Sequence, residues 1–205
     1  MPRPVKHSTD AMLDAARALI LDGGPAAASA RAVSQAVGAP SGSVYHRFPR
    51  RDDLVAAAWL RAQDRFLAVY LDALEGGDAD AGVAAAVTVL TWSGENPLDA
   101  ALLLSHSLRD LLRGPVSEEL AARAEDNRRR LGRAVARLAA ALGRSTADVT
   151  LAVVDLPYAV TRRVLRDRRA PAPAEAAALR RAAALLLGAD PGGEAPDRMI
   201  RRSRG

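Results

Sequence analysis

Apolar residues recur along this chain at helical spacing, and they predict helices almost from end to end. The first apolar face follows the i, i+3, i+4, i+7 rhythm of a helix with one buried side, and it consists of Met12, Ala15, Ala16, Leu19 and Ile20. Ser8, Thr9 and Asp10 offer N-caps before this face. The pair Gly23-Gly24 ends it, because glycine readily takes the left-handed conformation of a helix C-cap.

Two short helices are expected next, joined by a turn at Gly38. Ser29 is a candidate N-cap for the first of them, and Pro40 suits the first helical position of the second. In the second helix Val44 and Phe48 lie four residues apart and face inward together. The residues left facing outward or sideways are Ser41, Gly42, Ser43, Tyr45 and His46.

Six further helices are expected between Gly- or Pro-containing breaks, over residues 51–75, 79–92, 97–113, 117–142, 145–168 and 175–187. Pro157 falls inside one of them and leaves the Val153 carbonyl without its helical donor. A kink there borders a pocket or an interface, or simply bends the helix around the core. Residues 189–205 are rich in Gly, Pro and charge, which predicts a disordered tail. The fold class expected is all-α, with about nine helices.

Composition narrows the functions open to such a chain. There are no cysteines among its 205 residues, which excludes disulfides, thiol catalysis and thiolate metal sites. The three histidines are scattered and show no metal-ligand spacing. No stretch is apolar for long enough to span a membrane, and the N-terminus lacks the apolar segment of a signal peptide, so a cytoplasmic protein is expected. A net charge of +5 permits binding to a polyanion without proving it.

Two short helices joined by a glycine-containing turn form the helix-turn-helix pattern, whose second helix enters the major groove of DNA. The residue types suit that role. Gly42 removes a side chain where the helix must come close to the duplex, and Ser, Tyr and His side chains are short-reach donors for phosphates and base edges. Ser29 can offer a hydroxyl to a phosphate, and Arg51 can clamp the next one.

The segment GAPSGSVYHRFPRRDDL closely resembles the end of the DNA-binding domain of the tetracycline-repressor (TetR) family. The positions that fit that family's pattern are Gly38, Pro40, Gly42, Ser43, Val44, Tyr45, His46, Phe48, Arg51 and Leu54. Upstream, AARALILDGG and SARAVSQAVG resemble the family's first two helices. The departures are Ser41, where the family often has Lys or Arg, Ser34 in place of Ala, and Pro40, which has no capping hydroxyl. They affect which operator sequence is expected rather than the mode of binding.

The resemblance implies two domains and a function. A helix-turn-helix DNA-binding domain is expected over residues 6–66, with its motif at 29–48, followed by a helical ligand-binding and dimerisation domain over 67–188. The expected protein is a homodimeric repressor that binds a palindromic double-stranded DNA operator and is released by an unidentified small molecule. Its expected DNA-binding residues are Ser29, Arg31, Pro40, Ser41, Gly42, Ser43, Tyr45, His46 and Arg51.

The helices beginning near Ser145 and Glu175 are the candidates for dimerisation. Their apolar stripes exceed what burial on one side requires, and comprise Leu151, Val154, Val160 and Val164 on the first and Leu179, Ala183 and Leu186 on the second. Packing within one subunit alone is the alternative.

The polar and aromatic residues on otherwise aliphatic helices are the candidate ligand contacts, namely Trp92, His106, Arg109 and Tyr158. His106 and Arg109 are three residues apart, so on one helix they share a face and can meet an anionic or carbonyl ligand together. A satisfied histidine near the surface is equally compatible with the pattern. An enzyme using a central cavity needs a convergent acid–base set or a metal site, and a helical adaptor needs no hydroxyl-rich third helix. No catalytic residue, metal or cofactor is therefore expected.

Overall fold

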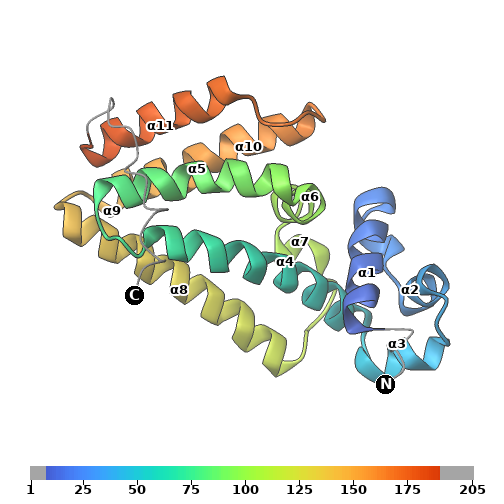
Figure 1. The fold of residues 1–205 in the computed structure, drawn as a ribbon. Helices are drawn as coiled ribbons and strands as arrows, with labels where there is room; N and C mark the ends of the chain where they lie inside the picture. Colours follow the sequence, from blue (N-terminus) through green and yellow to red (C-terminus); the bar gives the residue numbers. More distant parts are fainter. Residues whose placement is uncertain (1–7, 190–205) are drawn as a thin grey trace, which may run out of the picture.

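Three short helices form a small head at one end of the molecule, and a larger helical body makes up the rest (Figure 1). The computed structural model describes residues 8–189. The head contains α1 (Thr9–Gly23), α2 (Ala30–Val37) and α3 (Ser41–Arg47), with a 3-10 turn η1 (Pro25–Ala27) between the first two. Helix α4 (Arg51–Leu74) begins in the head and runs into the body, so the expected domain boundary at 66–67 falls within one continuous helix.

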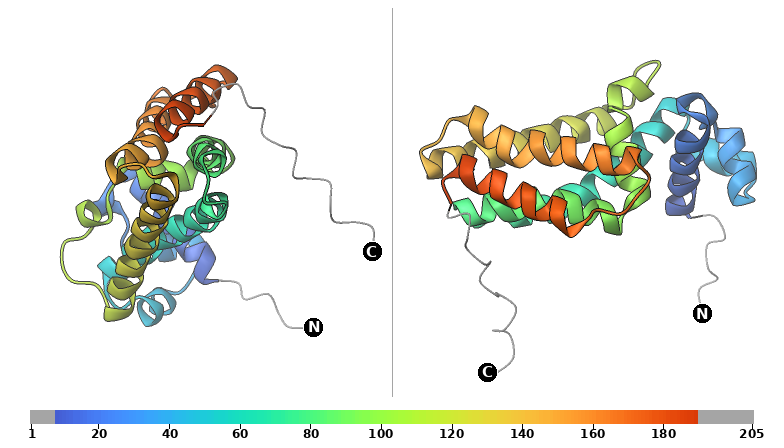
Figure 2. Two further views of the ribbon diagram at one scale, coloured as in Figure 1. Left: turned by 90° about the vertical axis from the view of Figure 1, so that its left-hand side faces the viewer. Right: turned by 90° about the horizontal axis from the view of Figure 1, so that it is seen from above.

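The body surrounds α4 with antiparallel and crossing helices. It contains α5 (Ala79–Glu95), α6 (Pro97–Ser105), α7 (Leu108–Leu111), α8 (Glu118–Leu142), α9 (Thr146–Thr150), a π-helical turn η2 (Leu151–Asp155), α10 (Leu156–Arg166) and α11 (Pro173–Leu187). Helices α5 and α8 pack against α4, and α10 and α11 lie side by side along the body (Figure 2). The all-α expectation is confirmed. No helix within residues 8–189 combines the length and the apolar character needed to cross a bilayer. The tail expected after residue 188 lies almost entirely outside the described residues.

Apolar side chains from all three head helices and the start of α4 form the core of the head. It consists of Met12, Leu13, Ala16, Ala30, Val33, Val44, Phe48, Leu54, Ala57 and Ala58. Val44 and Phe48 therefore face inward, as their spacing predicted. The caps are also as expected: the Ser8 and Ser29 hydroxyl oxygens each accept a hydrogen bond of 3.1 Å from a backbone N–H in the first turn. Gly38 ends α2 in the left-handed conformation with φ 66°.

The single helix expected over residues 97–113 is wrong, because the chain breaks at His106. This residue is extended (φ −139°, ψ 126°), and a new short helix begins after Ser107. One local and one long-range interaction favour the break. Ser107 and Asp110 form a capping box, which starts a helix at that point. The His106 carbonyl is turned to the Trp59 indole, whose Nε1 donates to it at 2.9 Å.

A π-helical turn, η2, precedes Pro157, and the chain continues past the proline as α10. Pro157 is buried, and the Val153 carbonyl, which the proline deprives of a helical donor, accepts a hydrogen bond of 2.7 Å from the Tyr70 hydroxyl. A buried carbonyl without a donor is costly, so the phenol of α4 stabilises this irregular turn. Burial raises the pKa of Tyr70. The hydroxyl therefore stays protonated and can donate.

Candidate nucleic-acid interface and ligand cavity

The outer face of α3 is polar and exposed, while its inner face is held by the head core. Tyr45 is 54% exposed although it is one of the few aromatic side chains in the chain. Six of the residues expected to contact DNA are exposed, namely Arg31, Pro40, Ser41, Gly42, Tyr45 and His46. Ser29 and Ser43 are partly exposed. The local fold thus brings these eight residues to one end of the molecule.

Gly42 is a helical residue that the fold itself does not require. A Cβ atom added there meets nothing within 4 Å, and its backbone is not in the left-handed region that favours glycine. A glycine inside a helix lowers helix stability by about 0.8–1.0 kcal/mol relative to alanine. The absence of a side chain therefore gives the head no packing advantage. It does leave the α3 backbone accessible to an external partner.

Arg51 differs from the other expected DNA contacts, because the structure directs it inward. Its Nη1 donates to the Leu111 carbonyl at 3.0 Å and to Asp52 Oδ1 at 2.6 Å. Its Nη2 donates to the Pro25 carbonyl. These partners lie on α7, on α4 and between α1 and α2. Arg51 therefore joins the head to the body, and its guanidinium is not presented beside the α3 surface.

The two carboxylates after Arg51 hold the loop that leads into α8. Asp52 Oδ2 accepts hydrogen bonds from the backbone N–H of Arg113 (3.0 Å) and of Gly114 (2.7 Å). Asp53 Oδ1 accepts one from Ser117 N–H at 2.8 Å. Burial alone raises the pKa of Asp52. Hydrogen bonds from Arg51, Arg113 and Gly114 outweigh that effect and hold the pKa of Asp52 below its ordinary value.

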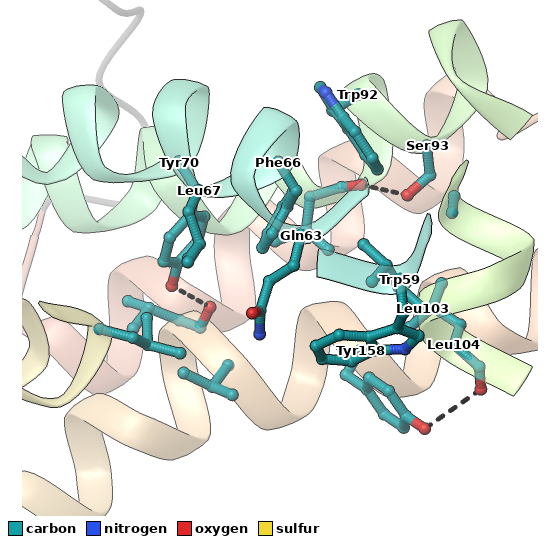
Figure 3. A pocket seen from close by; sticks show the side chains of 15 residues that line it. Trp59, Gln63, Phe66, Leu67, Tyr70, Trp92, Ser93, Leu103, Leu104 and Tyr158 are labelled. Carbon is teal, nitrogen blue, oxygen red and sulfur yellow. Dashed lines mark hydrogen bonds between the residues drawn. The ribbon is translucent and has the colours of Figure 1, made fainter. Parts of the chain in front are cut away.

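A cavity of about 190 Å³ lies within the body. Figure 3 shows that Trp59, Gln63, Phe66 and Tyr70 line it from α4, while Trp92 and Ser93 line it from α5. Leu103 and Leu104 of α6, Leu131 of α8, Val153 and Val154 of η2, and Tyr158 of α10 complete most of the wall. The chain has two Trp, three Tyr and two Phe, and five of these seven side chains line this cavity.

Aromatic packing organises one wall of the cavity. The Phe66 ring stacks on Tyr70 with centroids 5.1 Å apart and meets Trp92 edge-on at 5.2 Å. Both separations are within the range in which aromatic pairs attract. The wall is therefore a preformed apolar surface.

The structure separates the four residues expected to contact a ligand. Trp92 and Tyr158 line the cavity, and Tyr158 also donates to the Leu104 carbonyl at 3.3 Å. His106 and Arg109 are not among the lining residues, and Arg109 is exposed on α7. Because the chain breaks at His106, these two residues do not share a helical face. Sequence reasoning missed the cavity residues of α4, although a rare aromatic at Trp59 was a signal that it passed over.

The apolar stripes of the last helices are divided between the interior and the surface. Val164, Leu179 and Ala183 are buried within the subunit. Leu151, Tyr158 and Leu185 are 40%, 41% and 69% exposed. Val154, Val160 and Leu186 are partly buried against the same core, so packing within the subunit accounts for both predicted stripes apart from Leu151. Tyr158 and Leu185 are exposed apolar side chains that lie outside those stripes.

The cavity wall contains no side chains of the kinds that usually act in acid–base catalysis or bind metals. The lining residues include no carboxylate, histidine, lysine or arginine. Across residues 8–189, no group of three or more His, Asp and Glu side chains is placed to hold a metal ion.

A comparison with protein families matches the head and the start of α4. Residues 12–58 match the family described as bacterial regulatory proteins, tetR family, which confirms the resemblance seen in the sequence. A comparison with curated proteins found no match.

Solved structures share the overall arrangement of helices. A TetR-like transcriptional regulator from Rhodococcus sp. RHA1 is 23% identical with a TM-score of 0.65, covering 93% of this chain and 100% of that one. The fatty acid degradation regulator FadR from Bacillus halodurans is 15% identical with a TM-score of 0.65, covering 88% and 98%. A putative tetR family transcription regulator from Shewanella sp. PV-4 is 20% identical with a TM-score of 0.63, covering 88% and 96%. At these identities the likeness concerns the fold.

Proposed function

We propose that this protein is a DNA-binding transcriptional repressor that binds a palindromic operator as a homodimer and leaves it when a small molecule occupies the cavity. The observation that carries the proposal is the outer face of α3. A tetR-family head presents Tyr45, His46 and short hydroxyl side chains around a glycine that the fold does not need. Such a face suits a helix placed in the major groove.

The expected contacts divide by role. Tyr45, His46, Ser41 and Ser43 of α3 face the groove, while Ser29 and Arg31 at the start of α2 reach the adjacent phosphate backbone. Pro40 and Gly42 allow close approach of the backbone. Arg51 supports the head from inside through its bonds to Leu111 and Pro25.

A dimer is supported by the apolar side chains left exposed on the last helices. Leu151, Tyr158 and Leu185 are large apolar side chains that are exposed on η2, α10 and α11. Pairing of α10 and α11 with a second copy covers them. It also places two heads on one face of the DNA, about one helical turn apart.

The cavity connects to the head through two sets of hydrogen bonds, which the chain segment 106–114 joins. Trp59 lines the cavity and holds the His106 carbonyl. The segment after His106 continues to Arg113 and Gly114, whose N–H groups bind Asp52 in the first turn of α4. A ligand that displaces the Trp59 indole therefore acts on the junction between head and body, which sets the position of α3.

The test of this proposal is to select operator DNA with the purified protein. Fragments of genomic DNA captured by the full chain are expected to share a short palindrome, and their affinity is expected to fall steeply with salt, because phosphate contacts release counterions. Captured fragments without a shared sequence, or an affinity that salt does not change, contradict DNA as the target.

A further inference from the structure

The chemistry of the cavity wall restricts what it can bind. None of its lining residues is charged, and its wall is formed mainly by aromatic rings and aliphatic side chains. A charged ligand transferred there from water loses its hydration without gaining an ion pair, which is strongly unfavourable. The wall therefore favours an uncharged ligand.

The size of the cavity sets the scale of the ligand. Its volume is about 190 Å³, and an apolar cavity of roughly 150 Å³ holds one benzene molecule. A ligand with one ring and a short substituent fits this space. The rings of Phe66, Trp92 and Tyr70 in the wall favour a planar aromatic ligand, because aromatic rings attract one another in stacked and edge-on contacts.

Most of the polar hydrogens around the cavity are already used by the protein. The Ser93 hydroxyl donates to the Val89 carbonyl at 2.6 Å, and the Tyr70 hydroxyl donates to Val153 at 2.7 Å. Tyr158 donates to the Leu104 carbonyl, and the Trp59 indole donates to His106. These four groups therefore have no proton left to give a ligand.

Gln63 is the exception, and a chain of hydrogen bonds orients its amide. The Asp64 carboxylate can only accept hydrogen bonds. The Asn127 amide must therefore direct its NH₂ group toward Asp64, and its Nδ2 lies 2.5 Å from Asp64 Oδ1. The same Asn127 Nδ2 donates to Gln63 Oε1 at 3.0 Å. Gln63 must then present its oxygen to α8, which leaves Nε2 as a donor. In the part of the chain that the structure describes, no hydrogen-bond partner occupies that Nε2.

We propose that the cavity binds a neutral aromatic molecule of one ring that carries a carbonyl-type acceptor, and that this acceptor receives a hydrogen bond from Gln63 Nε2. The proposal rests on the proposed function, since it names the effector of the same cavity. The acceptor gives orientation, while the aromatic wall gives most of the affinity.

Four probes of similar size test separately whether the ligand needs an acceptor and must lack charge. The binding of each probe to the full chain without DNA is measured by ligand-observed NMR titration. Acetophenone has the ring and the carbonyl, ethylbenzene lacks the acceptor, benzoate is an anion and phenethylamine is a cation. Acetophenone is expected to bind at least tenfold more tightly than either charged probe and several-fold more tightly than ethylbenzene. Tighter binding of a charged probe, or binding by none of the four, overturns the proposal.

Substitutions in the protein test whether Gln63 donates the hydrogen bond to the ligand's acceptor. Gln63→Leu is expected to remove the preference for acetophenone over ethylbenzene while leaving ethylbenzene binding within twofold. Gln35→Leu, at an exposed position of α2, is the matched control and should retain the preference. Leu104→Trp, which fills the cavity, should abolish binding of both neutral probes. A preference that survives in Gln63→Leu overturns the role of this donor, and circular dichroism verifies that each variant is folded.

A gel-shift experiment with the same probes tests ligand-driven release of DNA separately from the class of ligand. Acetophenone binding that leaves the DNA complex intact supports the ligand class and contradicts ligand-driven release. Release of DNA by an anion that competes with acetophenone for the cavity supports the proposed function and overturns the ligand class.

Discussion

The Asp52 carboxylate and the Gly114 backbone N–H are joined by a hydrogen bond of 2.7 Å, which ties the first turn of α4 to the loop before α8. Arg113 N–H binds the same oxygen, and Arg51 binds the other oxygen of that carboxylate. The junction between head and body thus combines this polar cluster with an apolar cluster, in which Ile20 and Ala28 of the head pack with Leu102 and Leu111 of the body. The groups of the polar cluster are partly shielded from water, so loss of one partner leaves others unsatisfied.

Replacing Asp52 should weaken this junction. Asp52→Asn removes the charge that receives three donors and is expected to cost about 1–3 kcal/mol in the free energy of unfolding. Urea denaturation measures the change. Asp22→Asn, at an exposed position near the end of α1, serves as control and should change stability by less than about 0.5 kcal/mol. Equal effects of the two substitutions contradict the role of the cluster.

The same carboxylate predicts a pH dependence. The pKa of Asp52 is lower in the folded chain than its ordinary value, so its contribution is complete above about pH 4 and is lost as the pH falls through the folded pKa. The stability difference between the wild type and Asp52→Asn should therefore shrink on acidification below pH 4. Thermal denaturation of both proteins over a pH series measures it, and a difference that grows there contradicts the prediction.

Gly42→Ala should separate stability from DNA binding. Alanine is expected to stabilise α3 by up to about 1 kcal/mol, because it meets no neighbour and favours the helix. The added methyl should nevertheless weaken DNA binding at least tenfold. Gly132→Ala on α8 is the matched control, since a Cβ there also meets nothing within 4 Å. It should stabilise similarly without changing the gel shift.

Tyr45→Ala should abolish binding to the selected DNA while leaving the protein folded. Tyr45 is 54% exposed, so its removal is expected to change the unfolding free energy by no more than about 0.5 kcal/mol. Fluorescence anisotropy with the selected DNA measures affinity. Val69→Ala, another exposed apolar position at 47%, should keep full affinity. An unchanged affinity in Tyr45→Ala is incompatible with α3 as the reading helix.

Leu185→Arg should dissociate the proposed dimer. The side chain is 69% exposed in the subunit, so arginine is tolerated in a monomer but places a desolvated charge in an apolar interface. Light scattering after size-exclusion chromatography should show a mass near 21.5 kDa. Leu98→Arg, exposed on α6 at 52%, should leave the dimer intact; a dimeric Leu185→Arg argues against α11 as the interface.

The Tyr70–Val153 bond and Pro157 should be energetically coupled. Tyr70→Phe leaves the buried Val153 carbonyl without its donor and is expected to cost about 1–3 kcal/mol. Pro157→Ala restores a backbone N–H four residues after Val153, so Tyr70→Phe should cost less in that background. A double-mutant cycle by chemical denaturation measures the coupling. Additive effects contradict it.

Local signals in the sequence determined the helices of the head. Ser8 and Ser29 cap their helices, Gly38 ends α2, and Val44 and Phe48 anchor α3, all as expected. These features depend on residues within a few positions of one another. The alternation of apolar and polar side chains and the capping chemistry therefore determine them directly.

Tertiary packing decided the break at His106, the inward direction of Arg51 and the lining of the cavity. Trp59 and His106, Arg51 and Leu111, and Gln63 and Asn127 are each paired across distant parts of the chain. A local pattern does not contain such pairs. They form only when α4 is enclosed by the helices that follow it, because each buried polar group must then find a partner among whatever side chains and carbonyls that packing brings near.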